Sequence, residues 1–98
     1  MKVVSGTQEY RVNFYKVHKG RGGKSGVDTK CVISHVLNPN AERQFNDIAT
    51  GLARHNPRER YSRVLGKRIA LGRALKEAHL PDFDNANIMD QFATEFGE

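Results

Sequence analysis

The sequence is poor in the residues that stabilise small secreted proteins or cross a membrane. It contains a single cysteine, Cys31, and no tryptophan. One cysteine excludes an internal disulfide bond and is typical of a reducing compartment. The opening residues, MKVVSGTQEY, lack the apolar core of a signal peptide, and no apolar run approaches the roughly 20 residues of a membrane span. We therefore expect a cytoplasmic protein with no membrane partner.

The length of the chain, 98 residues, fits one domain with a small core. A domain of this size buries little surface alone, so a homo-oligomer is a reasonable expectation. Within a single domain spanning residues 1–98, we expect a flexible N-terminus over residues 1–9. Residues 81–98 form an acidic C-terminal segment.

Charge is distributed unevenly along the sequence. Residues 1–80 carry all sixteen lysines and arginines against six acids, a sum of +10, whereas residues 81–98 carry five acids and no base, a sum of −5. A strongly basic body indicates an anionic partner. The acidic segment is able to fold back on the body and mask part of this charge.

Three segments have strand patterns. Residues 10–19 alternate, with Tyr10, Val12 and Phe14 on one face and Tyr15 on the other, and residues 27–37 are apolar and β-branched. Residues 44–55 are ambiguous, because apolar residues recur there at both helical and alternating spacing. We favour a third strand of a meander over a helix for this segment.

The clearest secondary-structure prediction from the sequence is a helix from Pro57 to His79. Asn56 is a suitable N-cap, Pro57 fits the first helical position, and Pro81 stops the helix. A stripe of Ile88, Met89, Phe92 and Phe96 then predicts a short terminal helix. The expected fold is α+β: a three-stranded antiparallel β-meander packed on a long basic α-helix, with a short C-terminal helix.

The segment HKGRGGKSG, residues 18–26, ends like a phosphate-binding P-loop. The pattern needs a glycine where His18 stands and a helix afterwards, but an apolar strand follows. We therefore interpret it as a hairpin tip. Its bases Lys19, Arg21 and Lys24 remain accessory candidates for phosphate contacts.

Arg68 is the leading candidate for a binding site. A helical projection places it near the middle of an apolar face formed by Tyr61, Val64, Leu65, Leu71, Gly72 and Leu75. A buried guanidinium needs a carboxylate, a phosphate or access to water. Arg68 therefore forms either an ion pair, for instance with the acidic segment, or the bidentate fork of an anion pocket.

Other bases surround Arg68 in the sequence. Residues 58–76 contain seven bases and one acid, which form either an ordinary solvated surface or a set of phosphate contacts, which this density suits. Tyr15 stands among bases on the outward sheet face, where it either stacks on a nucleobase or packs in an interface. The candidate ligand-binding residues are Arg68, Arg73, Arg63, Lys67 and Tyr61, with Tyr15 grouped with the accessory hairpin.

Catalytic and metal-binding patterns are weak. No nucleophile, base and acid are marked by a strained-turn motif. Cys31 and His35 share a strand face but lie about 13 Å apart along it, too far for one metal ion. We expect a protein that is not an enzyme and uses no cofactor or metal.

The stretch HNPRERYSRVLGKRIALGRALK, residues 55–76, resembles a type of small bacteriophage accessory protein, whose helix carries a core like Gly66 to Leu75 here. The resemblance implies a counter-defence role in the host cytoplasm. Such proteins inhibit a nuclease complex or sequester a nucleotide signal, as the anti-Thoeris sponge proteins do. No binding residue is transferred from the resemblance.

Three functions remain open at this point. The first is a non-enzymatic binder of an anionic nucleotide-type ligand, which the predicted position of Arg68 favours. The second is a nucleic-acid-binding module that places a β-hairpin and a basic helix on the phosphate backbone. The third is an inhibitor that binds a host defence protein, which the acidic, phenylalanine-rich tail favours.

Overall fold

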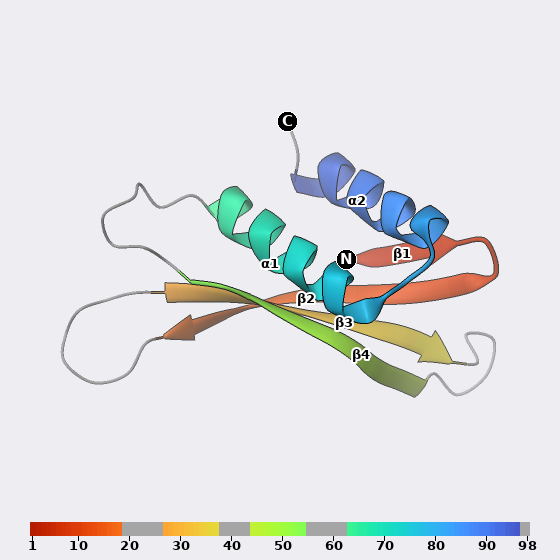
Figure 1. Cartoon of the computed structure of the whole chain (residues 1–98), viewed down its shortest axis with the longest axis horizontal. Helices are drawn as coiled ribbons and strands as arrows, with labels where there is room; N and C mark the ends of the chain where they lie inside the picture. Colours follow the sequence, from red (N-terminus) through yellow and green to blue (C-terminus); the bar gives the residue numbers. More distant parts are fainter. Residues whose placement is uncertain (19–26, 38–43, 55–62, 97–98) are drawn as a thin grey trace.

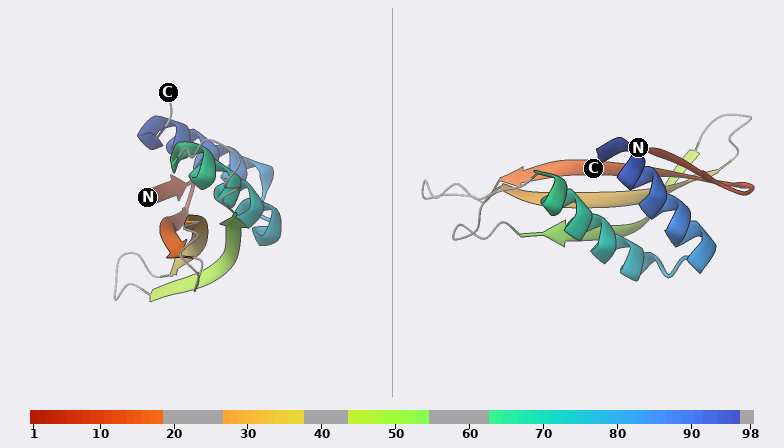
Figure 2. Two further views of the ribbon diagram at one scale, coloured as in Figure 1. Left: turned by 90° about the vertical axis from the view of Figure 1, so that its left-hand side faces the viewer. Right: turned by 90° about the horizontal axis from the view of Figure 1, so that it is seen from above.

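The computed structural model describes residues 1–18, 27–37, 44–54 and 63–96. In this part of the chain, four antiparallel strands form one sheet in the order β1-β2-β3-β4, and two helices follow (Figure 1). Both helices cover the same face of the sheet (Figure 2). The elements are β1 (Lys2–Ser5), β2 (Gln8–His18), β3 (Val27–Leu37), β4 (Gln44–Ala53), α1 (Arg63–Ala78) and α2 (Asp82–Phe96).

The expected α+β class and the three expected strands are confirmed, but the sheet has a fourth strand. Residues 1–9, expected to be flexible, contain β1 and the start of β2. Gly6 and Thr7 connect the two strands, and Gly6 has a φ of 60°. A glycine with positive φ at the first position of a two-residue connection is typical of a tight hairpin. This signal was present in the sequence and was missed.

The segment that was ambiguous between strand and helix is β4. Its register with β3 shifts between Ile33 and Ser34, where Ala49 pairs with Ile33 and Asp47 with Ser34, so that Ile48 is an extra residue. An extra residue of this kind interrupts the alternation of a strand. The bulge therefore explains why the apolar residues of this segment did not follow one periodicity.

Small residues form the contact between β4 and α1. Ala49, Gly51 and Ala53 of β4 face the helix side, and Ala70 and Ala74 of α1 are buried against the sheet. A β carbon on Gly51 would overlap the backbone carbonyl of Ala70 and the backbone nitrogen of Ala74. The helix therefore approaches the strand closely because neither side carries bulk. Larger core residues surround this contact, among them Val12, Cys31, Ile33, Leu71 and Ile88.

The helices differ in extent from the expectation. The described part of α1 has 16 residues, and residues 57–62, expected to begin it, lie outside the described residues. The helix ends before His79, whose φ of 53° is the left-handed conformation common at helix C-termini. The second helix is not short, since its 15 residues nearly match the length of α1. No helix in the described ranges has the length and apolar character to cross a bilayer.

A network of buried polar side chains connects α2 to the hairpin formed by β1 and β2. Asp84 accepts hydrogen bonds from the hydroxyl groups of Ser5 and Tyr10, at 2.5 and 2.7 Å. The side-chain amide of Asn87 donates to the Ser5 hydroxyl at 2.9 Å. Ile88 and Phe92 continue the same helix face into the core. The acidic segment thus folds onto the body through one of its acids and its apolar residues.

Candidate functional site

Arg68 does not lie on the apolar face of α1. The buried residues of this helix are Ala70, Leu71, Ala74 and Leu75, whereas the Arg68 side chain is exposed. The helical projection of the sequence used the large apolar residues to locate the buried face of α1. It placed that face wrongly, because two of the four buried residues are alanines. Among the described residues, Arg68 forms no ion pair, with α2 or elsewhere. The observation that favoured an anion pocket around Arg68 is therefore corrected.

Lys67 lies over an aromatic cluster. Its ammonium nitrogen lies 4.4 Å from the ring centre of Phe96 and 5.7 Å from that of Phe14. Phe14, Phe92 and Phe96 contact one another, with ring centres 5.1–5.9 Å apart. A cation over an aromatic face is attracted by the ring quadrupole. Lys67 therefore connects α1 to the end of α2.

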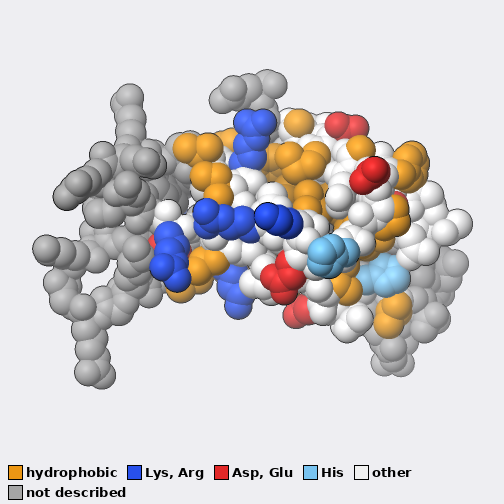
Figure 3. All heavy atoms as spheres, in the orientation of Figure 1, with side chains coloured by type: hydrophobic (Ala, Val, Ile, Leu, Met, Phe, Trp, Pro, Cys, Tyr) orange, Lys and Arg blue, Asp and Glu red, His pale blue; other side chains and the backbone are white. Residues whose placement is uncertain are grey.

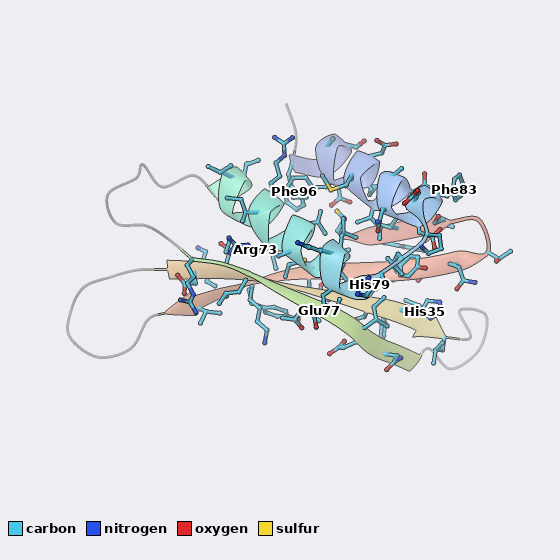
Figure 4. All side chains as sticks on the ribbon, in the orientation of Figure 1. His35, Arg73, Glu77, His79, Phe83 and Phe96 are labelled. Carbon is cyan, nitrogen blue, oxygen red and sulfur yellow. The ribbon has the colours of Figure 1, made fainter. Side chains whose placement is uncertain are left out.

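Arg73 lies at the free edge of the sheet. Its guanidinium points from α1 toward β4 (Figure 4) and donates a hydrogen bond of 2.5 Å to the backbone carbonyl of Leu52. Since β4 is the last strand in the sheet order of the described residues, this bond occupies one backbone acceptor of an edge strand. A guanidinium has five N–H donors, so others remain for further contacts.

Several predicted site residues lie outside the described part of the structure. These are Tyr61, which was expected on the helix, and Lys19, Arg21 and Lys24, which were expected in a hairpin tip. Arg63 is the first described residue of α1, but its side chain is not among those described. The strand that argued against a P-loop is present as β3, beginning at Val27.

Tyr15 lies on the sheet face that neither helix covers, as the alternation of β2 predicted. Its side chain is 52% exposed. The strand register pairs Tyr15 with Lys30 of β3, and Lys30 in turn with Leu52 of β4, so the three residues form a row across the sheet. The Lys30 side chain is exposed. An aromatic ring and an ammonium group therefore stand side by side on an open surface.

Further residues extend this row into a patch. Val17 is exposed next to Tyr15 on the same face, and Arg54 is exposed directly after β4. Asp28, which pairs with Val17 on the same face, is 6% exposed and places one carboxylate beside these bases. We call the open surface formed by Tyr15, Val17, Lys30, Leu52 and Arg54 the sheet patch.

The opposite end of the same sheet face has a different charge pattern. Glu9 is nearly buried there, with one carboxylate oxygen 3.7 Å from the Lys2 ammonium and the other 3.7 Å from the Arg11 guanidinium. Asp47 accepts a hydrogen bond of 2.5 Å from the Ser34 hydroxyl. Acids therefore offset the bases at this end, and the sheet patch is the more positive part of the face.

The same polarity is visible on the side of the molecule shown in Figure 3. Lysine and arginine side chains gather over the half of the described surface where α1 begins, and acids and histidines over the other half. Sequence reasoning missed Lys30 and Arg54 as candidates. A hairpin closed around residues 19–26 would have paired position 15 with position 30, so a signal for Lys30 was present in the sequence.

The most perturbed titratable groups are structural. Burial and the neighbouring Asp84 raise the pKa of Tyr10 to about 12, and burial raises the pKa of the Cys31 thiol to about 12. A buried thiol with a raised pKa is a poor nucleophile. Among the described residues, no three His, Cys, Asp or Glu side chains are grouped in a way that would hold a metal ion.

Comparisons with models of protein families, with curated proteins and with solved structures found no match to this chain.

Proposed function

We propose that the protein binds single-stranded nucleic acid, without catalysis, through the sheet patch. The main observation in support is that Tyr15 and Lys30 are exposed and paired on neighbouring strands, on the face of the sheet that the helices do not cover. An aromatic ring on an open sheet offers a stacking surface to an unpaired base, and an adjacent ammonium group contacts the backbone phosphate.

The distribution of charge supports a polymer over a small nucleotide. The exposed bases near the sheet patch come from different elements, with Lys30 on β3, Arg54 directly after β4, and Arg73 of α1 at the adjacent β4 edge. Bases spread in this way contact successive phosphates of a strand, whereas a nucleotide pocket requires them to converge. The convergent alternative depended on Arg68, which is exposed.

The inhibitor hypothesis also loses its supporting feature. That hypothesis was favoured by the acidic, phenylalanine-rich character of residues 81–98. Phe92 is buried in the core and Phe96 packs in the aromatic cluster, so only Phe83 is strongly exposed among the described phenylalanines of this segment.

Fluorescence anisotropy with a labelled oligonucleotide tests the proposal. We expect binding to single-stranded DNA or RNA, weaker binding to a duplex of the same length, and a steep loss of affinity with salt, because bound phosphates release counterions. Equal affinity for duplex and single strand would contradict base stacking at Tyr15. No binding at low salt would overturn the function itself.

A further inference from the structure

The outward surface of the helix layer carries opposite charges on its two helices. The sequence of α1 holds five bases and one acid, a sum of +4, and that of α2 holds four acids and no base, a sum of −4. Of these charged residues, Arg68, Arg73, Lys76 and Glu77 on α1 and Asp82, Asp90 and Glu95 on α2 are exposed. Arg73 reaches toward the β4 edge, so Arg68 and Lys76 are the basic residues of α1 considered for this surface. Asp84 is excluded because the Ser5 and Tyr10 hydroxyl groups bind it inside the protein.

Apolar surface accompanies these charges. Leu65 and Ile69 are 49% and 40% exposed, and with Gly72 and Lys76 they lie on successive turns of α1, on the side opposite the buried alanines. A β carbon on Gly72 would have no atom within 4 Å, so this position leaves room for a close neighbour. On α2, Phe83 is 65% exposed and points away from the protein (Figure 4).

We propose that this surface binds a second copy of the chain, with α1 of each protomer packed against α2 of the other. A two-fold axis running along the helix layer brings the basic helix of one copy over the acidic helix of its partner and repeats the same contact in reverse. Such a self-complementary contact is the commonest arrangement of homodimers. Every helix then faces an oppositely charged helix.

Charge complementarity selects this pairing over the alternatives. Packing α1 on α1 would bring together two helices that each have a net charge of +4. Packing α2 on α2 would bring together two helices that each have a net charge of −4. Like charges across an interface are unfavourable and exclude wrong partners. The exposed leucine, isoleucine and phenylalanine supply apolar area to bury. The sheet patch lies on the face of the sheet opposite to the two helices, which Figure 2 shows on one face only.

Charge reversal provides the test. One variant carries Arg68→Glu and Lys76→Glu, and a second carries Asp82→Lys and Asp90→Lys, all at exposed positions. Analytical ultracentrifugation should find the wild-type protein as a dimer at low salt and each variant alone as a monomer. An equimolar mixture of the two variants should form dimers again, because basic and acidic helices face each other in both contacts of the mixed pair.

Three outcomes of these measurements would overturn the proposed dimer. A wild-type protein that stays monomeric at low salt, up to its solubility limit, would overturn the proposal. Dimers that persist in either variant alone would place the association on another surface and so overturn the proposal. A mixture of the two variants that remains monomeric would also overturn it. Melting temperatures of the variants close to that of the wild-type protein, all measured in high salt where the proposed dimer is weakened, show that the variants are folded. Oligonucleotide binding by the monomeric variants separates this proposal from the proposed function, since each can fail without the other.

Discussion

The backbone of Gly51 in β4 meets the carbonyl of Ala70 in α1 so closely that a β carbon on Gly51 would overlap the Ala70 oxygen. This contact sets the distance between helix and sheet, and the position of α1 in turn determines where Arg73 reaches the Leu52 carbonyl. The spacing of the layers is therefore determined by the absence of a side chain at one position.

The substitution Gly51→Ala tests this contact. Since the overlapping atoms belong to the backbone, α1 has to move as a whole, and we expect a loss of about 1–3 kcal/mol in the free energy of unfolding, or more. Urea denaturation measures the loss. The matched control is Gly72→Ala, at an exposed helical position with open space around it, and both variants are measured in high salt so that the proposed dimer contact does not contribute. This variant should gain roughly 0.5–1 kcal/mol, because alanine favours a helix more than glycine does. A Gly51→Ala protein as stable as the wild type would contradict the close approach.

The network around Asp84 leads to a second prediction. The substitution Asp84→Asn keeps the shape but replaces a carboxylate that accepts two hydroxyl donors, and one donor is then left facing an amide NH2 group. We expect a loss of about 1.5–3 kcal/mol, typical of buried hydrogen bonds to a charged group. Denaturation of Asp82→Asn in high salt serves as the comparison, because Asp82 is exposed in the first turn of the same helix. It should cost at most about 0.3–1 kcal/mol, the effect of one charge near a helix N-terminus. Equal stability of the two variants would show that the network does not fasten α2.

Alkaline pH should destabilise the protein. The pKa of Tyr10 rises from 10.0 to about 12 on folding, so above pH 10 the unfolded chain loses this proton while the folded protein keeps it. The contribution of Tyr10 to stability is therefore complete below pH 10 and falls between about pH 10 and pH 12. The raised pKa of Cys31 acts in the same direction from pH 9 upward. Denaturant titrations across this range measure the slope, and Tyr10→Phe should reduce it. An unchanged slope in that variant would exclude Tyr10 as a cause.

Stacking at the sheet patch gives a prediction for binding. We expect Tyr15→Ala to weaken the affinity for a single-stranded oligonucleotide by about 1–3 kcal/mol, the range for one stacked base, and Tyr15→Phe to retain most of it. Phe45→Ala is the control, because Phe45 is an equally exposed aromatic residue at the far end of the same sheet. If Phe45→Ala weakened binding as much as Tyr15→Ala, the site would not be the sheet patch.

The periodicity and capping signals predicted the three longer strands, the existence of α1 and its end near Pro81, and the open face on which Tyr15 lies. Alternation over many residues is a strong local signal, since it reflects burial on one face. The strand β1 was missed because four residues carry little periodicity, although Gly6 marked its hairpin. The length of α2 was underestimated, because only its apolar stripe was considered.

The sequence by itself determined the class of fold, the order of its main elements and the concentration of charge of opposite sign in two adjacent helices. Only the tertiary structure decided which face of α1 is buried, and hence that Arg68 is exposed and Lys67 covers an aromatic cluster. The physical reason is the close packing of small residues. Gly51, Ala70 and Ala74 contribute little to an apolar pattern, yet their lack of bulk allows the closest approach of helix and sheet and so fixes the rotation of the helix.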